Sequence, residues 1–105
     1  MKIGAFVLLV TKGFSQLNKD TQAKIVKMAL SKIRIPFPDF IVFDPKADEE
    51  AVEDEGRTVR IPFPNLDENV YAILDDHGSA EMLSMQLGQQ VNTKYTITFL
   101  LASEY

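Results

Sequence analysis

The sequence contains no cysteine, and it has a single histidine among 105 residues. The absence of cysteine excludes disulfide bonds, thiol catalysis and thiolate metal sites, and it is typical of a reducing compartment. The longest uninterrupted apolar runs, residues 5–10 and 99–102, are far shorter than the roughly 18 residues of a membrane-spanning helix. We therefore expect a cytoplasmic protein with no membrane partner, located in the host cell cytoplasm if a phage encodes it.

The composition predicts one small globular domain over residues 1–105. Apolar residues make up 46% of the chain and charged residues 25%, and a chain of this length supports one hydrophobic core. Lys2 and the apolar residues 3–10 have the outline of a secretory signal, but no small-x-small cleavage pattern follows them. We interpret residues 3–10 as the first strand.

Hydrophobic periodicity predicts two helices and five strands. Apolar side chains from Ile25 to Ile33 recur on one stripe, which indicates an amphipathic helix that starts after Ser15 or Asn18 and ends near Arg34. A second helix is expected after Ser79, with Gly88 as its end. Besides the first strand, the predicted strands cover residues 40–43, 57–61, 70–74 and 95–101.

This order of elements, β-α-β-β-β-α-β, predicts an α+β fold. We expect a ferredoxin-like two-layer sandwich, with a mostly antiparallel sheet and both helices on one face.

Two segments resemble parts of known families. Residues 70–101, with a strand, a Gly-Ser-Ala-Glu helix start and an apolar last strand, resemble the closing half of small ferredoxin-like CRISPR-associated nucleases. That likeness is topological and has no diagnostic motif, and Val10-Thr11-Lys12 stands where those nucleases carry a metal-binding aspartate. Residues 13–19, which lead into a lysine-rich helix, are similar to the start of small phage anti-CRISPR proteins that bind an HNH nuclease domain. Lysine-rich helices after a strand are common, so this likeness identifies no family.

The charges are sorted along the chain. The formal net charge of −4 combines +6 over residues 1–34, −7 over 35–56 and −3 over the remainder. Most of the negative charge lies in a polar excursion at about residues 45–56, which we expect to be an exposed and partly disordered loop. Its carboxylates are the predicted contacts for a partner protein with a basic surface: Asp48, Glu49, Glu50, Glu53, Asp54 and Glu55.

A hexapeptide pattern occurs twice, as Arg-Ile-Pro-Phe-Pro-Asp from Arg34 and as Arg-Ile-Pro-Phe-Pro-Asn from Arg60. Alternate prolines keep a chain extended and remove hydrogen-bond donors. Phe37 and Phe63 are therefore candidate partner contacts if they are exposed. The alternative, which we favour, is that both segments are rigid connectors that place the two rings at the edge of the core.

One cluster has metal-ligand or acid-base character. It consists of Asp75, Asp76 and His77, with Asp44 at another strand end. The same residues suit a turn and a helix cap, which is the interpretation we favour. The alternative is a small metal-dependent ferredoxin-like nuclease or hydrolase. No nucleophile motif or phosphate-binding loop occurs, and we predict no cofactor and no catalytic residue.

The basic helix face around Lys24 and Lys27 is expected to be solvated, and we expect no direct nucleic-acid binding by a chain of this charge. The favoured function is a non-catalytic protein-binding domain. Within this class we expect a phage or mobile-element inhibitor or regulator that binds a basic, nucleic-acid-handling partner through the acidic loop. A homo-oligomeric virion component is a further alternative, in which the basic segment of one subunit meets the acidic segment of the next.

Overall fold

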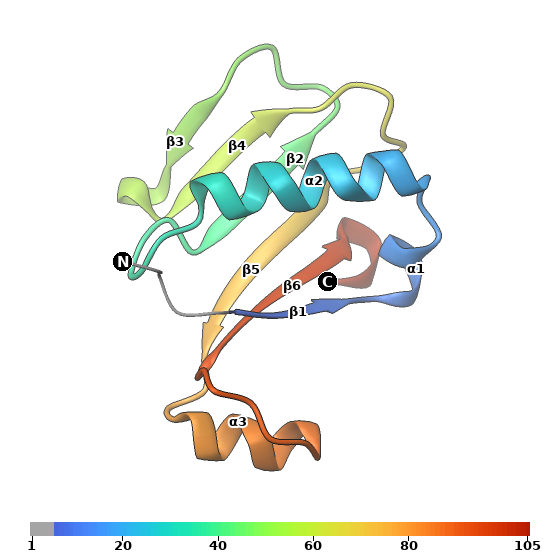
Figure 1. Cartoon of the computed structure of the whole chain (residues 1–105). Helices are drawn as coiled ribbons and strands as arrows, with labels where there is room; N and C mark the ends of the chain where they lie inside the picture. The colour runs from blue at the N-terminus through green and yellow to red at the C-terminus, as the bar shows by residue number, and fades with distance from the viewer. Residues whose placement is uncertain (1–5) are drawn as a thin grey trace.

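The computed structural model describes residues 6–105, which form a small α+β domain (Figure 1). Its α-helices and strands, in chain order, are β1 (Val7–Val10), α1 (Lys12–Ser15), α2 (Lys19–Lys32), β2 (Phe40–Asp44), β3 (Ala51–Glu53), β4 (Thr58–Pro62), β5 (Val70–Asp76), α3 (Ala80–Leu87) and β6 (Tyr95–Leu101). Two short 3-10 helices complete it, η1 (Asp54–Gly56) and η2 (Ala102–Glu104). Residues 3–5 of the predicted first strand lie outside the described residues.

Side-chain caps define the N-terminal ends of the two longer helices. The Asn18 side chain accepts the backbone N–H of Asp20 at 2.8 Å, which starts α2. The Ser79 hydroxyl accepts the N–H of Met82 at 3.1 Å, and α3 ends at Gly88 with φ 73°. A left-handed φ at the residue after a helix favours glycine because glycine has no Cβ.

The sheet has the strand order β1-β6-β5-β2-β4-β3 and is mixed. β1 is parallel to β6 and β2 is parallel to β4, whereas the other three neighbouring pairs are antiparallel. The predicted strand order and the mostly antiparallel sheet are therefore wrong in detail. Strand β3, which the sequence did not indicate, accounts for one of the two parallel pairs: it takes the outer edge, and β4 returns between β3 and β2 and so runs parallel to β2.

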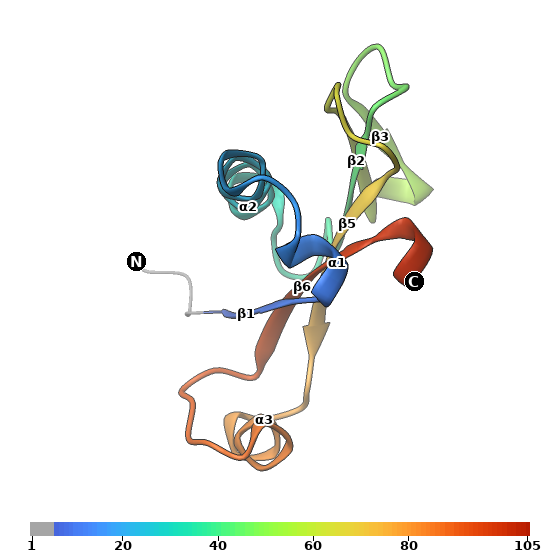
Figure 2. The same cartoon turned by 90° about the vertical axis from the view of Figure 1, so that its right-hand side faces the viewer.

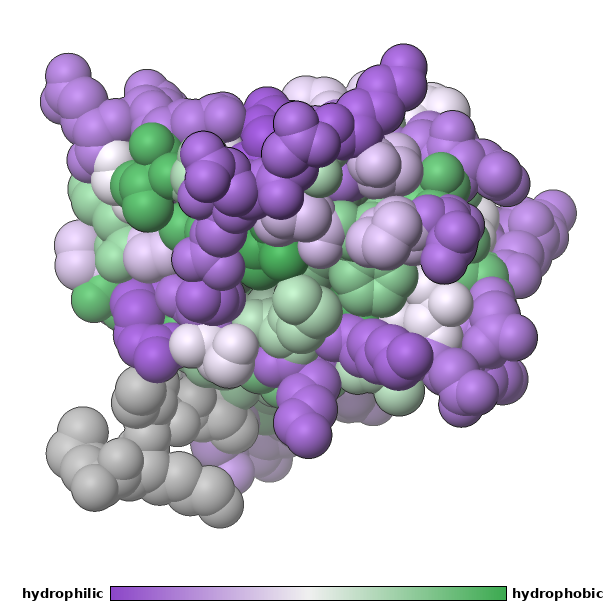
Figure 3. All heavy atoms as spheres, turned by 90° about the horizontal axis from the view of Figure 1, so that it is seen from above, coloured by the Kyte–Doolittle hydropathy of each residue, from purple (hydrophilic) through white to green (hydrophobic). Residues whose placement is uncertain are grey.

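The core lies between α2 and one face of the sheet. Helix α2 buries Ile25 and Ala29 completely against strand residues that include Ile41, Phe43 and Phe99. Figure 2 shows α2 beside the sheet and α3 beyond the ends of β5 and β6 rather than beside α2. The prediction placed both helices on one face of the sheet, whereas α3 lies beyond the ends of the strands. Seen from above in Figure 3, hydrophilic side chains surround small hydrophobic areas.

The strands leave a second face that points away from α2. Because successive strand residues point to opposite faces, the neighbours of the core residues project to this side. We call it the far face and define it by Phe40, Val42, Thr58, Arg60, Tyr71 and Ile73.

Candidate interaction surface on the far face

Three aromatic rings meet on the far face. Phe40 of β2 and Tyr71 of β5 lie edge to face, with their ring centroids 5.1 Å apart. The ring of Tyr105 packs against both, at 6.2 Å from Phe40 and 5.5 Å from Tyr71. Edge-to-face contacts at these distances are favourable for aromatic pairs. The far face therefore has an aromatic cluster composed of residues 40, 71 and 105.

Glu104 fixes the backbone that carries Tyr105. Its carboxylate accepts the N–H of Gly13 and the N–H of Leu101, both at 2.9 Å, and the hydroxyl of Thr11. These hydrogen bonds lower the pKa of Glu104, with the Thr11 hydroxyl as the largest cause. A Cβ on Gly13 would lie 2.7 Å from Cδ of Glu104, so only glycine fits there without displacing the carboxylate. The last turn of the chain is thus tied to α1.

Arg60 lies beside the aromatic cluster and binds two carboxylates. Its guanidinium donates to Asp44 Oδ2 at 2.7 Å and to Glu53 Oε2 at 2.8 Å. The pKa of Asp44 is lowered, mainly by the backbone N–H of Lys46 and also by Arg60. The Arg60 side chain lowers the pKa of Glu53 in the same way. Two carboxylates around one guanidinium leave this group with a net negative charge.

Two hollows flank Phe40. The first, of about 330 Å³, is lined by Phe40, Val42, Asp54, Thr58, Arg60, Asn69 and Tyr71. The second, of about 200 Å³, is lined by Asp39, Phe40, Asp54, Arg57, Thr58, Ile73, Leu74 and Asp75. Phe40, Asp54 and Thr58 border both hollows. Three acidic residues from separate segments, Asp39, Asp54 and Asp75, therefore line a hollow beside this aromatic ring.

The predicted acidic loop is an ordered hairpin. It contains β3, which pairs with β4, and the turn η1, where Asp54 and Glu55 have φ near 54° and Gly56 has φ 91°. Left-handed φ values are uncommon for residues other than glycine, and aspartate tolerates them better than most. This turn brings Asp54 over the far face.

The six predicted carboxylates of this segment have different roles. Glu53 is bound to Arg60, and Glu50 forms an ion pair with Lys32 at 3.0 Å. The exposed carboxylates for which no ion pair occurs within residues 6–105 are Asp48, Glu49, Asp54 and Glu55. Of these, only Asp54 borders the two hollows.

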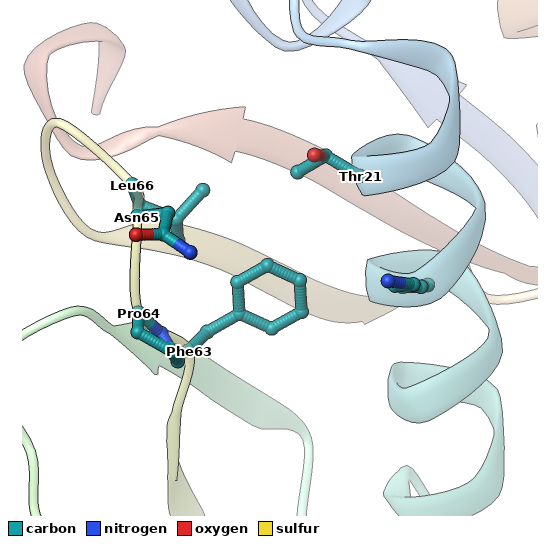
Figure 4. A pocket seen from close by; sticks show the side chains of 6 residues that line it. Thr21, Phe63, Pro64, Asn65 and Leu66 are labelled. Carbon is teal, nitrogen blue, oxygen red and sulfur yellow. The ribbon is translucent and has the colours of Figure 1, made fainter.

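The two Pro-Phe-Pro segments occupy different environments. Phe63 packs on the core side, with its ring centroid 5.9 Å from that of Phe43. It lines a hollow of about 320 Å³ with Thr21 and Lys24 of α2 (Figure 4). Phe37 is 45% exposed and lies under the guanidinium of Arg57, at 4.8 Å from its ring centroid. Because Arg57 also borders the second hollow, Phe37 lies close to the far-face surface, whereas Phe63 does not.

The residues of the predicted metal cluster are not brought together. Strands β2 and β5 are antiparallel, so Asp44 lies beside the start of β5, where Phe43 pairs with Val70. Asp75 is five residues further along β5, or about 17 Å at roughly 3.4 Å per residue. No group of three or more histidine, cysteine or acidic side chains suited to a metal occurs within residues 6–105.

Asp76 and His77 support the turn before α3. Asp76 accepts the N–H of Gly78 at 2.8 Å, which lowers its pKa, and its other oxygen lies 3.4 Å from Lys94 Nζ. His77 Nε2 lies 2.8 Å from the Thr96 hydroxyl. Asp75 alone of the predicted cluster borders a far-face hollow, together with Asp54 from the acidic segment.

The aromatic members of the far face and Arg60 were not predicted from the sequence as site residues. Phe40 and Tyr71 lie on predicted strands, so marking alternate residues would have placed both rings opposite the core. The position of Tyr105 had no sequence signal, because it depends on the contacts of Glu104 with α1.

Comparison with protein-family models, curated proteins and solved structures finds no significant match to this chain. Within residues 6–105, no helix has the length and apolar character required to cross a bilayer.

Proposed function

We propose that the chain is a non-catalytic protein-binding domain whose far face binds a basic segment of a partner protein. The observation that carries this proposal is the position of Asp54 between two hollows that also contain Phe40 and, in one of them, Asp39 and Asp75. Aromatic rings and arginine are enriched at the centres of protein interfaces, where they contribute most of the binding energy. The far face has the same combination of residue types around Phe40, namely the rings of Tyr71 and Tyr105 and the guanidinium of Arg60.

The charge of the surface selects the partner. Arg60 is neutralised by Asp44 and Glu53, so it does not repel an incoming cation. Asp39, Asp54 and Asp75 outnumber Arg57 around the second hollow. At this hollow a lysine or arginine side chain would meet acidic residues as well as an aromatic face. Cations bind favourably over such faces.

Within this proposal the partner handles nucleic acid and the domain inhibits or regulates it. A surface that receives phosphates is basic, and a row of carboxylates can occupy it in their place. The carboxylates at positions 48, 49 and 55 extend the negative charge from Asp54 along the hairpin.

The test is capture of partners from the source cells by the tagged chain, followed by their identification and a binding titration with the purified partner. The test variant is Asp54→Asn/Asp75→Asn, which removes two charges and keeps a residue that tolerates a left-handed φ at position 54. We expect a basic partner that is released by salt and binds this variant at least tenfold more weakly. The control variant Lys24→Glu/Lys27→Glu changes α2 on the other side of the sheet and should bind as the wild type does. Equal affinity of the wild type and the Asn variant would refute the far-face assignment.

A further inference from the structure

The two edges of the sheet differ in charge. At one edge, β3 carries Glu53 and is flanked by the carboxylates of residues 48–50, 54 and 55. At the other edge, β1 has the sequence Val-Leu-Leu-Val, and residues 6–11 contain no charge. Charged side chains on an edge strand prevent association through its free backbone groups, and β1 has none.

The outer side of β1 presents both backbone groups and apolar side chains. Thr11 donates its N–H to Phe99 O at 3.1 Å, and the parallel register pairs Leu8 with Ile97 and Val10 with Phe99. In such a ladder the N–H and C=O groups of Leu8 and Val10 point away from β6. Within residues 6–105, no strand pairs with this side of β1.

Two side chains of β1 are exposed at this open edge. Ile97 and Phe99 are fully buried, whereas Leu8 and Val10, beside them in the sheet, are 45% and 52% exposed. An additional strand along β1 would cover both.

We infer that the outer edge of β1 binds the β1 strand of a second copy of this chain, antiparallel and across a two-fold axis. In this register Leu8 of one copy pairs with Val10 of the other, and each pair exchanges both of its N–H···O bonds. Leu9 faces its own symmetry copy. Because all four residues of β1 are aliphatic, the contacts on both faces of the joined sheet are apolar.

Charge favours the β1 strand of a second copy, rather than its β3 strand, as the partner of this edge. In the antiparallel register Lys12 lies opposite Phe6 of the second copy, so the two Lys12 residues are about 20 Å apart along the strands. That separation exceeds the Debye length of about 10 Å at moderate salt. Pairing of β3 with a second β3 would instead bring the acidic segments together. Pairing of β1 with β3 is head-to-tail and would build rings or open chains rather than a two-fold dimer.

The test is sedimentation velocity of the full chain from about 5 to about 500 µM, which covers weak and moderate dimers. The test variant is Val10→Lys, and its matched control is Val52→Lys, which places the same charge on an exposed valine of β3. We expect the wild type and Val52→Lys to form dimers as the concentration rises, and Val10→Lys to remain a monomer. Circular dichroism of each variant shows whether it is folded.

Amide hydrogen exchange of the wild type provides a readout that needs no variant. The amides of Leu8 and Val10 should exchange at least tenfold more slowly at the highest concentration than at the lowest, whereas the Thr11 amide, bonded within the monomer, should not change. A monomer at every concentration, or a dimer that persists in folded Val10→Lys, would overturn the inference. Assemblies larger than a dimer that form in the wild type but not in Val52→Lys would also overturn the inference, because they would indicate pairing of β1 with β3.

Discussion

The repeated Pro-Phe-Pro segment allows one side chain to be tested in two environments of the same molecule. Phe63 is partly buried against Phe43 and the core, whereas Phe37 is 45% exposed and contacts the guanidinium of Arg57. Replacing each phenylalanine by alanine removes the same atoms from the same local sequence. Any difference in stability between the two variants therefore comes from the surroundings of the ring.

The expected magnitudes follow from buried area. Truncating a phenylalanine to alanine removes roughly 100 Å² of apolar surface, of which Phe63 has most buried, so the transfer contribution is about 2 kcal/mol. Loss of the edge-to-face pair with Phe43 adds about 1 kcal/mol. Phe63→Ala should therefore lower the free energy of unfolding by about 3 kcal/mol. For Phe37→Ala, half of the same area gives about 1.5 kcal/mol or less, because no cavity remains in the core.

Urea unfolding followed by circular dichroism measures both changes, with the m-value as a check that the unfolded states are comparable. A loss in Phe37→Ala equal to or larger than that in Phe63→Ala would refute the assignment of Phe63 to the core edge.

Three further predictions concern single positions. The pKa of Asp44 in the folded state is lowered below 3.8, so ionised Asp44 stabilises the fold above that pH, and this contribution is lost as the pH falls through the lowered pKa. In urea unfolding from about pH 5 to about pH 2, the free energy of unfolding should therefore decrease less for Asp44→Asn than for the wild type. Gly88→Ala places a Cβ at φ 73° and should cost about 1 kcal/mol in the same assay, whereas no loss would argue against the left-handed helix end. Gly13→Ala should displace the Glu104 carboxylate and lower the melting temperature, but it should cause no further loss in a Glu104→Ala background, where the obstructing carboxylate is absent.

Local signals predicted most of the elements. The predicted second helix and last strand correspond to α3 and β6, because Ser79, Gly88 and the alternating threonines act within a few residues. Strand β3 had no such signal: it is three residues long and lies in a segment whose charge is typical of a solvated loop. It stabilises the hairpin through pairing with β4 and through the contact of Glu53 with Arg60, both of which depend on the fold.

The candidate surface was predictable only in part. The acidic segment was visible in the sequence, but its position over Phe40 depends on the turn at Asp54. Asp44 and Asp75 were expected at neighbouring strand ends but lie apart, because chain order does not specify whether two strands are parallel or antiparallel. Carboxyl ends meet at one edge only when the strands are parallel, and β2 and β5 are antiparallel.

In the proposed function the same acidic segment both stabilises the hairpin and supplies charge for binding, and different carboxylates would carry these two roles. Reversing all six carboxylates would also remove the ion pair of Glu53 with Arg60 and that of Glu50 with Lys32. A loss of partner binding in such a variant would then have two explanations, a damaged hairpin or a missing contact. Neutralising Asp54 leaves both ion pairs in place and changes the charge beside Phe40. Comparing these two variants therefore distinguishes a surface that recognises its partner from a hairpin that is merely required to fold.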